Sequence, residues 1–296
     1  MNQTSKTPPT YWGFDGVFPG ALGVYNQGDV FTNKLTWVAE RGFHGGHVGV
    51  ESLSNPDHCN VLETLSASHQ QSWSVGFHPT LTEPESDVQT TLQIQSQRMI
   101  ESANQFDLPL ASVVVPGGIH RFMKDFPLQD QLRKLETLLT PLVNTLSEAG
   151  IRVAIENHGD YYISDLMELC ERVPGLTIQL DTGNCFLIGE RPDQIPDEAY
   201  PLISCTHFKD HYVYPVAKGL SFQLTGATLG EGDVGLKAIY EKLMALHDDP
   251  TSVRLTTEWV PDPDKNVKTC FNASAKFLQR LSGAHFTPNL LEEASE

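Results

Sequence analysis

Short apolar runs rich in β-branched residues alternate along the chain with longer stretches of helical periodicity. The clearest helix is predicted at Gln129–Ala149, where leucine and valine recur every three or four positions and Gly150 follows as a C-terminal cap. Further helices are predicted at Asn33–Arg41, Val88–Phe106, Ile163–Val173, Leu236–His247 and Lys268–Leu281. Strands are predicted at Tyr11–Phe14, His47–Val50, Trp73–Phe77, Ser112–Val115, Arg152–Ile155, Thr177–Leu180, Ile203–Thr206 and Val253–Thr257, and the stretch Tyr212–Gly235 is predicted to be irregular.

This alternation of strands and helices favours a parallel sheet, because the chain must cross back between parallel strands and a helix usually makes that crossing. Eight strand and helix units in 296 residues give about 37 residues per unit, which is typical of a (β/α)8 TIM barrel. An open doubly wound sheet is the alternative, but Gly13–Gly16 lacks the G-x-G-x-x-G pattern such a sheet usually carries. No linker composition divides the chain, so we expect one domain over residues 1–296.

The charge balance narrows the classes of partner. The chain has 20 Lys+Arg and 37 Asp+Glu, a formal net charge of −17, and its 40% hydrophobic and 19% charged residues are typical of a globular protein. Such an excess of negative charge repels phosphate backbones and anionic lipids. We therefore expect a small molecule or a metal ion as the partner, and no nucleic acid or membrane; a homo-oligomer is compatible with the sequence.

Cysteine usage and the absence of long apolar runs bear on the compartment. The five cysteines are scattered and form no C-x-x-C pair, which argues against a disulfide framework and against a thiolate zinc site. Neither a signal peptide nor an apolar run long enough to cross a membrane is visible. A reducing, cytoplasmic location is expected.

Four consecutive predicted strands each end on a side chain that can bind a metal ion. These side chains are Glu156, Asp181, His207 and Glu258. A single acidic residue at a strand end commonly caps the next helix, but four successive strand ends are harder to explain in that way. Because the carboxyl ends of barrel strands meet at one face, three carboxylates and one imidazole are expected to converge there. This set suits one divalent ion such as Mn²⁺, Co²⁺ or Mg²⁺, and Zn²⁺ is not excluded.

Other polar side chains are expected near the same face. His78 ends its predicted strand whereas His47 begins the strand before it, so His78 is the better candidate for a pocket residue. His158 is a candidate substrate contact or ligand, with a hydrogen-bonded loop histidine as the alternative. Lys209 is expected either to bind a substrate oxygen and balance the carboxylates, or to pair with Asp210 at the surface.

Five motifs follow predicted strands or lie in the last long connection: Glu156-Asn157-His158, Leu180-Asp181-Thr182-Gly183-Asn184, His207-Phe208-Lys209-Asp210, Leu229-Gly230-Glu231-Gly232-Asp233, and Glu258. Together they resemble the xylose isomerase-like TIM-barrel superfamily, which includes sugar isomerases and epimerases, inosose dehydratase-like enzymes and AP endonuclease 2-like repair enzymes. The resemblance spans most of the chain. It implies a divalent metal held by Glu156, Asp181, His207 and Glu258, with the two glutamates flanking the substrate.

The resemblance also implies a reaction class. A metal-dependent isomerase or epimerase would act on a sugar, keto-sugar or cyclitol, with Glu156 and Glu258 transferring a proton next to a carbonyl. The alternative is a lyase or dehydratase that acts on a 3-keto-glycoside or inosose through the same metal-stabilised enediolate. Less favoured are a non-catalytic sugar-binding barrel and an AP endonuclease.

Two positions depart from enzymes that resemble the tagatose 3-epimerase group. Those enzymes usually carry a histidine where this chain has Asn184, and an arginine shortly after the metal-binding histidine, where this chain has Lys209. Together with His78 and His158, both residues are expected to contact a substrate. No basic cluster is visible, so an unphosphorylated carbohydrate is favoured.

Overall fold

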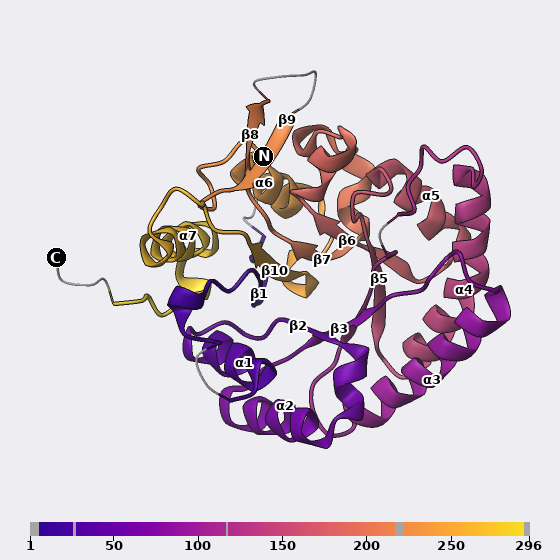
Figure 1. Cartoon of the computed structure of the whole chain (residues 1–296), viewed down its shortest axis with the longest axis horizontal. Helices are drawn as coiled ribbons and strands as arrows, with labels where there is room; N and C mark the ends of the chain where they lie inside the picture. The colour runs from indigo at the N-terminus through magenta and orange to yellow at the C-terminus, as the bar shows by residue number, and fades with distance from the viewer. Residues whose placement is uncertain (1–5, 26–27, 117, 217–221, 293–296) are drawn as a thin grey trace.

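The computed structural model describes residues 6–25, 28–116, 118–216 and 222–292, and its centre is an eight-stranded parallel sheet (Figure 1). The strands follow the order β1-β10-β7-β6-β5-β4-β3-β2 around the sheet. Their bounds are β1 (Tyr11–Gly16), β2 (His47–Gly49), β3 (Ser74–Phe77), β4 (Leu110–Val113), β5 (Arg152–Glu156), β6 (Leu176–Asp181), β7 (Ile203–His207) and β10 (Arg254–Trp259).

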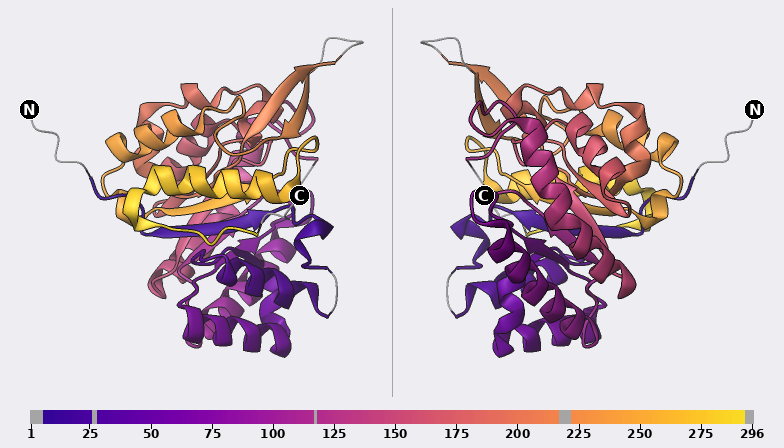
Figure 2. Two further views of the ribbon diagram at one scale, coloured as in Figure 1. Left: turned by 90° about the vertical axis from the view of Figure 1, so that its left-hand side faces the viewer. Right: turned by 90° about the vertical axis from the view of Figure 1, so that its right-hand side faces the viewer.

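Helices surround this sheet and confirm the predicted (β/α)8 barrel architecture (Figures 1 and 2). They are α1 (Val30–Glu40), α2 (Pro56–His69), α3 (Glu85–Ala103), α4 (Leu128–Glu148), α5 (Ile163–Arg172), α6 (Leu236–Leu246) and α7 (Val267–Ser282). In α4 the apolar stripe predicted from the sequence is buried, and Gly150 just beyond the helix has φ +76°, as a C-terminal cap requires.

The barrel closes between β1 and the segment before β2. The Phe14 N–H donates to the Gly45 carbonyl at 2.9 Å, and the His44 N–H donates to the Trp12 carbonyl at 2.9 Å. Gly45 has φ +142°, and a side chain there would collide with the Ser72 carbonyl. Glycine at this position therefore allows three neighbouring chain segments to approach closely.

Side-chain alternation separates the two faces of each strand. Along β5, Val153 and Ile155 belong to the large apolar core shared with the helices, whereas Ala154 packs with Leu110 and Cys205 in a separate small cluster inside the barrel. The same alternation turns Glu156, at the end of β5, toward the interior. The strand-end polar residues are thus directed inward by strand periodicity.

The far end of the barrel interior is also polar. Arg254, at the start of β10, is 5% exposed and donates to the Ser72 Oγ at 2.9 Å, the Ser72 carbonyl at 3.0 Å and the Ser74 Oγ at 3.3 Å. Its guanidinium lies over the Tyr11 ring, 3.5 Å from the centroid. These contacts satisfy a buried cation without a carboxylate partner among the described residues.

Two connections differ from the expected pattern. Helix α2 was not predicted, because it buries only Leu62 and Leu65 and so has a weak apolar stripe; its N-terminus is marked by Asn55, whose side chain accepts from the Asp57 N–H. Between β6 and β7 the described chain forms 3-10 turns at Asn184–Ile188, Pro192–Gln194 and Asp197–Leu202 in place of an α-helix. Prolines along this connection explain the short turns, since proline lacks the N–H that an α-helix interior needs.

The prediction of an irregular stretch at Tyr212–Gly235 is wrong for part of its length. Strand β8 (His211–Pro215) pairs antiparallel with β9 (Phe222–Gly226), and this hairpin projects from the barrel (Figure 2). Residues 217–221 lie outside the described residues. Strand β4 also begins two residues earlier than predicted, because its ladder with β5 starts at Leu110 and Arg152. No helix in the described ranges is both long and apolar enough to cross a membrane.

Candidate metal centre

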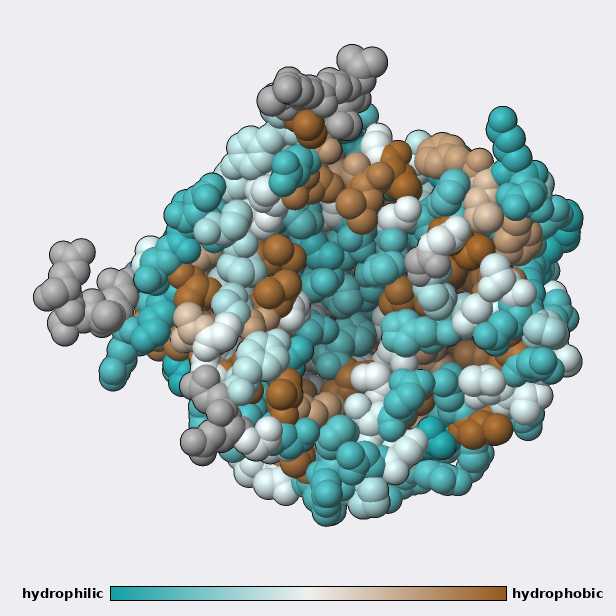
Figure 3. Space-filling view, in the orientation of Figure 1, coloured by the Kyte–Doolittle hydropathy of each residue, from teal (hydrophilic) through white to brown (hydrophobic). Residues whose placement is uncertain are grey.

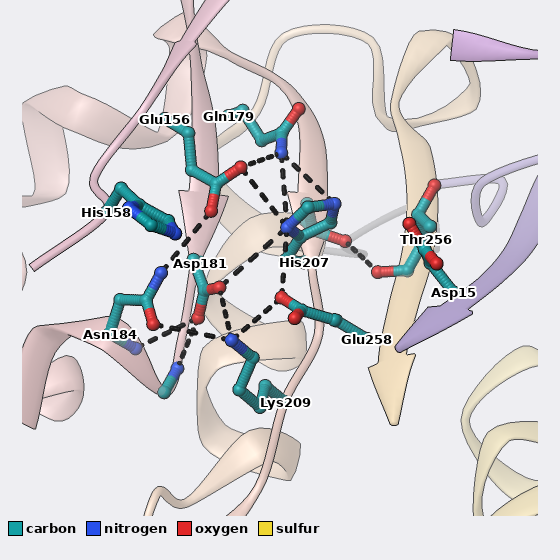
Figure 4. Close-up of polar contacts among 12 residues, drawn as sticks. Asp15, Glu156, His158, Gln179, Asp181, Asn184, His207, Lys209, Thr256 and Glu258 are labelled. Carbon is teal, nitrogen blue, oxygen red and sulfur yellow. Dashed lines mark hydrogen bonds and ion pairs between the residues drawn. The ribbon is translucent and has the colours of Figure 1, made fainter. Parts of the chain in front are cut away.

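The four strand-end residues predicted from the sequence come together at one end of the barrel interior (Figure 4). Glu156, Asp181, His207 and Glu258 each offer a ligand atom, and these atoms all lie within 4.8 Å of one another. His207 Nδ1 is central to the group: it lies 3.2 Å from Glu156 Oε2, 3.1 Å from Glu258 Oε2 and 3.8 Å from Asp181 Oδ2. The geometry is that of a compact set with three carboxylates and one imidazole.

Amide side chains hold the carboxylates in place. Gln179 Nε2 donates to Glu156 Oε2, and Asn184 Nδ2 donates to Glu156 Oε1 at 3.3 Å (Figure 4). Asn157 joins the ends of β5 and β6, because its Nδ2 donates to the Asp181 carbonyl at 2.9 Å and its Oδ1 accepts from the Asp181 N–H at 2.8 Å. The Glu156 carboxylate is therefore oriented by neutral donors, and the backbone of Asp181 is fixed to the end of β5.

Lys209 is buried within the acidic group and is not a surface lysine. Its Nζ lies 2.9 Å from Asp181 Oδ2 and 2.7 Å from Glu258 Oε2, and its side chain is 9% exposed. It does not pair with Asp210, whose carboxylate instead accepts backbone hydrogen bonds from the loop at Gly230–Val234. Of the two sequence interpretations of Lys209, the geometry supports the one in which it balances the carboxylates.

Burial and neighbouring charges shift the pKa values in the cluster. Burial favours neutral His207, but Glu156 and Glu258 outweigh it and hold the His207 pKa well above its ordinary value. Burial raises the pKa of Asp181 to about 7, although Lys209 opposes the rise. Burial also favours neutral Glu258, yet contacts with His207 and Lys209 hold the Glu258 pKa below its usual range. In the metal-free chain, a proton on His207 thus offsets part of the negative charge.

The donor set fits a divalent cation. Asp181 Oδ1 accepts from the N–H groups of Gly183 and Asn184 at 2.9 Å each, whereas Oδ2 is buried and accepts no hydrogen bond within the described part of the chain, with Lys209 as its ionic neighbour. Three carboxylates this close repel each other unless cations neutralise them. With neutral His207, a divalent ion and Lys209 would together balance the three charges, and the oxygen-rich set suits hard or borderline ions.

A cavity of about 290 Å³ opens over this cluster. Glu156, His207 and Glu258 line it, together with His78 and His158. The space-filling view shows a hydrophilic hollow near the centre of this face (Figure 3). A groove between α3 and α4 has a larger volume, about 380 Å³, but its lining residues carry no titratable group. The cavity at the strand ends is therefore the better candidate for chemistry.

The residues predicted to bind substrate fall into two groups. His78 and His158 line the cavity. Asn184 and Lys209 lie behind the glutamates: Lys209 Nζ donates to Asn184 Oδ1 at 3.3 Å, and both residues contact carboxylates of the cluster. Contact of these four residues with a substrate remains a prediction.

Sequence reasoning missed two cavity residues, Asp15 and His47. Asp15 is the next residue after the predicted first strand, so the signal that singled out the other acidic strand ends applied to it as well. His47 begins β2, and its position along the strand is the reason why the sequence favours His78 over it. Barrel closure staggers the strands, however, and the hydrogen bonds between β1 and the segment before β2 place His47 near the level of Asp15, at the end of β1.

Known structures share this architecture. The structure of 3-keto-D-glucoside 4-epimerase from E. coli matches with a TM-score of 0.66 and 14% identity, covering 92% of this chain and 99% of that chain. A magnesium complex of a xylose isomerase-like TIM barrel protein from Mycobacterium smegmatis matches with a TM-score of 0.65 and 16% identity, covering 96% of this chain and 100% of that chain. The probable 3-DHS dehydratase AsbF from Bacillus anthracis matches with a TM-score of 0.62 and 14% identity, covering 91% of this chain and 98% of that chain. At these identities the likeness shows the fold alone.

A search among curated proteins found no significant match. The family model described as xylose isomerase-like TIM barrel, in contrast, matches residues 37–280, which include all four residues of the cluster. The chain therefore belongs to the xylose isomerase-like TIM barrel family.

Proposed function

We propose that the protein is a divalent-metal-dependent isomerase or epimerase that acts on a small unphosphorylated carbohydrate. The observation that carries this proposal is the position of Glu156 and Glu258. Both glutamates belong to the cation-binding cluster and both line the cavity, and they reach it from different strands, β5 and β10. Two carboxylates at one cation site can act on a substrate from two directions.

When bound, the cation would polarise a carbonyl and its neighbouring hydroxyl, which makes the adjacent C–H more acidic. One glutamate then removes that proton. In an epimerisation the second glutamate returns a proton to the other face, whereas in an aldose–ketose isomerisation a proton moves to the adjacent carbon. Gln179 and Asn184 orient Glu156, while Lys209 Nζ lies 2.7 Å from Glu258 Oε2 and favours the ionised form of that carboxylate.

The cavity supports the substrate class. Its volume of about 290 Å³ lies at the lower end of the range for ligand pockets, which suits a monosaccharide or cyclitol. The lining residues include no lysine or arginine, so a phosphate or carboxylate group would find no side-chain ionic partner there besides the bound cation. The histidines His78 and His158 can exchange hydrogen bonds with hydroxyls. The set of three oxygen donors and one nitrogen donor favours Mn²⁺, Co²⁺ or Mg²⁺, with Zn²⁺ also able to bind.

A lyase or dehydratase is the second candidate, and one observation favours it. His78 and His158 line the cavity beside the glutamates, so either histidine is placed to protonate a leaving hydroxyl after the first proton is removed. Among the structural neighbours, a probable dehydratase and an epimerase share this fold. Both candidates begin with the same proton abstraction and separate only afterwards.

A screen in deuterated water tests the proposal. The metal-loaded protein is incubated with ketoses, 3-keto-glycosides and inososes, and products are analysed by mass spectrometry and NMR. An isomerase or epimerase returns a product of substrate composition with deuterium at the exchanged carbon, whereas a lyase releases water or an aglycone. Glu156→Gln and Glu258→Gln should each reduce turnover at least 100-fold, and Glu241→Gln, an exposed position on α6, is the matched control. Unchanged turnover in either cluster variant contradicts the proposed roles.

A further inference from the structure

The ring of His47 lies against the ring of His207. His47 Nδ1 is 3.1 Å from His207 Nε2, and the two ring centroids are 4.9 Å apart at an interplanar angle of 75°. His207 Nδ1 faces Glu156 and Glu258, and Gln179 Nε2 lies near both ring nitrogens, 3.3 Å from Nδ1 and 3.2 Å from Nε2. The amide NH₂ of Gln179 cannot accept a hydrogen bond, so His47 is the acceptor on the Nε2 side. One nitrogen faces the carboxylates and the other faces His47.

Proton counting fixes the direction of the bond between the two histidines. A neutral imidazole has one N–H and one lone pair. If the Nδ1 lone pair of His207 binds a cation, its proton must sit on Nε2 and donate to His47 Nδ1. His47 then accepts at Nδ1 and carries its own proton on Nε2. In this arrangement an N–H of one ring faces a lone pair of the other, and no two N–H groups face each other.

The surroundings of His47 indicate that this contact is its main polar interaction. His47 Nε2 is buried and has no hydrogen-bond partner among the described residues. His47 as a whole is half-buried and lines the cavity, but this nitrogen is shielded from water. The described residues thus provide His47 with one specific polar role, at His207.

We propose that His47 is a positioning residue, which accepts the Nε2–H of His207 and holds that ring in the tautomer that presents its Nδ1 lone pair to a divalent cation. This inference rests on the cation site of the proposed function. Outer hydrogen bonds of this kind fix the orientation of a ligand imidazole and raise its basicity.

A second cation among Asp15, His47 and His207 is the competing interpretation, because ligand atoms of these three residues also lie within 4.8 Å of one another. If cations occupied both sites, both nitrogens of His207 would be ligands and its ring would have to lose its last proton. An imidazolate is costly near several carboxylates, so the hydrogen bond is favoured. The two interpretations differ in the number of ions bound per chain.

Substitutions at His47 separate these roles. The metal-stripped protein is titrated with Co²⁺ and followed by absorption spectroscopy and calorimetry. Asparagine places an amide oxygen near the position of Nδ1, so His47→Asn should bind Co²⁺ within about 3-fold of the unsubstituted protein. Phenylalanine keeps the ring but has no acceptor, so His47→Phe should weaken Co²⁺ binding by about 10- to 100-fold. His78→Phe is the matched control in the same cavity and should leave the affinity unchanged.

A spectroscopic readout tests the tautomer itself. In protein labelled with ¹⁵N-histidine and loaded with diamagnetic Zn²⁺, the His207 Nε2–H should resist exchange with water, and His47→Phe should remove that protection. Circular dichroism verifies folding, and His47→Leu replaces the phenylalanine variant if that variant does not fold. Unaltered Co²⁺ affinity in the folded apolar variants overturns the proposal. It is also overturned if the unsubstituted protein binds two Co²⁺ per chain and both His47→Asn and His47→Phe bind only one. No substrate is used, so a failure to turn over sugars bears only on the proposed function.

Discussion

The carboxylate of Asp210 accepts a hydrogen bond from the backbone N–H of Gly232 at 3.1 Å, and a side chain on Gly232 would collide with that carboxylate. Asp210 also accepts from the N–H groups of Gly230 at 2.8 Å, Val234 at 3.3 Å and His211 at 3.0 Å. The glycine-rich turn of the sequence is therefore anchored to the chain that leaves β7, just beyond His207. This one buried carboxylate accepts four backbone hydrogen bonds and thereby holds the loop.

Replacing Asp210 by asparagine should destabilise the protein by about 1–3 kcal/mol, because an amide NH₂ would face backbone N–H groups that now share a carboxylate. Urea unfolding at neutral pH measures the change. Glu231→Gln is the control, since Glu231 lies in the same loop in an exposed pair with Lys265 and should change stability by under about 0.5 kcal/mol. Equal stability of the two variants would show that the loop is held by other contacts.

Lys209→Met should destabilise the metal-free protein by about 3–5 kcal/mol, because it removes the lysine partner of the buried Asp181 carboxylate and of the half-buried Glu258 carboxylate. The same change should strengthen Co²⁺ binding by about 10-fold, because a positive charge next to the ligands is lost. Thermal unfolding with and without Co²⁺ measures both effects. Lys265→Met, at an exposed pair, is the control. A Lys209→Met variant that is not rescued by metal would contradict the charge-balance argument.

Removing bound metal should lower the stability of the protein, since an ion that binds only the folded state stabilises it. At a free concentration 100 times the dissociation constant this stabilisation is about 2.7 kcal/mol. The melting temperature should fall after chelation and recover on addition of Mn²⁺, Co²⁺ or Mg²⁺. In Glu258→Gln the recovery should be much smaller, because one ligand has lost its charge. Full recovery in that variant would place the ion elsewhere.

Asp160 should make stability depend on pH. Its carboxylate is buried, with Oδ1 accepting from the N–H groups of His158 and Tyr161 and Oδ2 without a partner among the described residues, and burial raises its pKa to about 7. The pKa of Asp160 is higher in the folded protein than its unfolded value of about 4, so the folded state favours the protonated acid. The stabilisation that comes from protonated Asp160 is complete below about pH 4 and is lost as the pH rises through about 7.

Asp160→Asn mimics the protonated acid and should remove that dependence. At pH 8 the variant should be about 2–4 kcal/mol more stable than the unsubstituted protein, and the difference should shrink toward pH 5. Urea unfolding between pH 5 and 8 in the presence of a chelator provides the measurement. Asp248→Asn, at an exposed position, should leave the pH profile unchanged. If Asp160→Asn and the unsubstituted protein show the same dependence of the free energy of unfolding on pH, ionisation of Asp160 does not destabilise the folded protein.

Local patterns were sufficient for much of the architecture. Strand and helix periodicity predicted the (β/α)8 barrel, and four strand-end residues pointed to one cluster because parallel strands of a barrel end on one face. Helix α2 and the β8–β9 hairpin escaped prediction, since the first buries few apolar residues and the second depends on pairing between two short segments.

Tertiary structure decided the surroundings of the cluster. Lys209 has the same neighbours in sequence whether it is exposed or buried, and only the assembled barrel places its ammonium between Asp181 and Glu258. His47 begins a strand, yet the stagger introduced by barrel closure carries it to His207, a residue 160 positions away in the chain. Periodicity determines which way a side chain points. The register between neighbouring strands depends on long-range packing, and this register determines which side chains surround each charge.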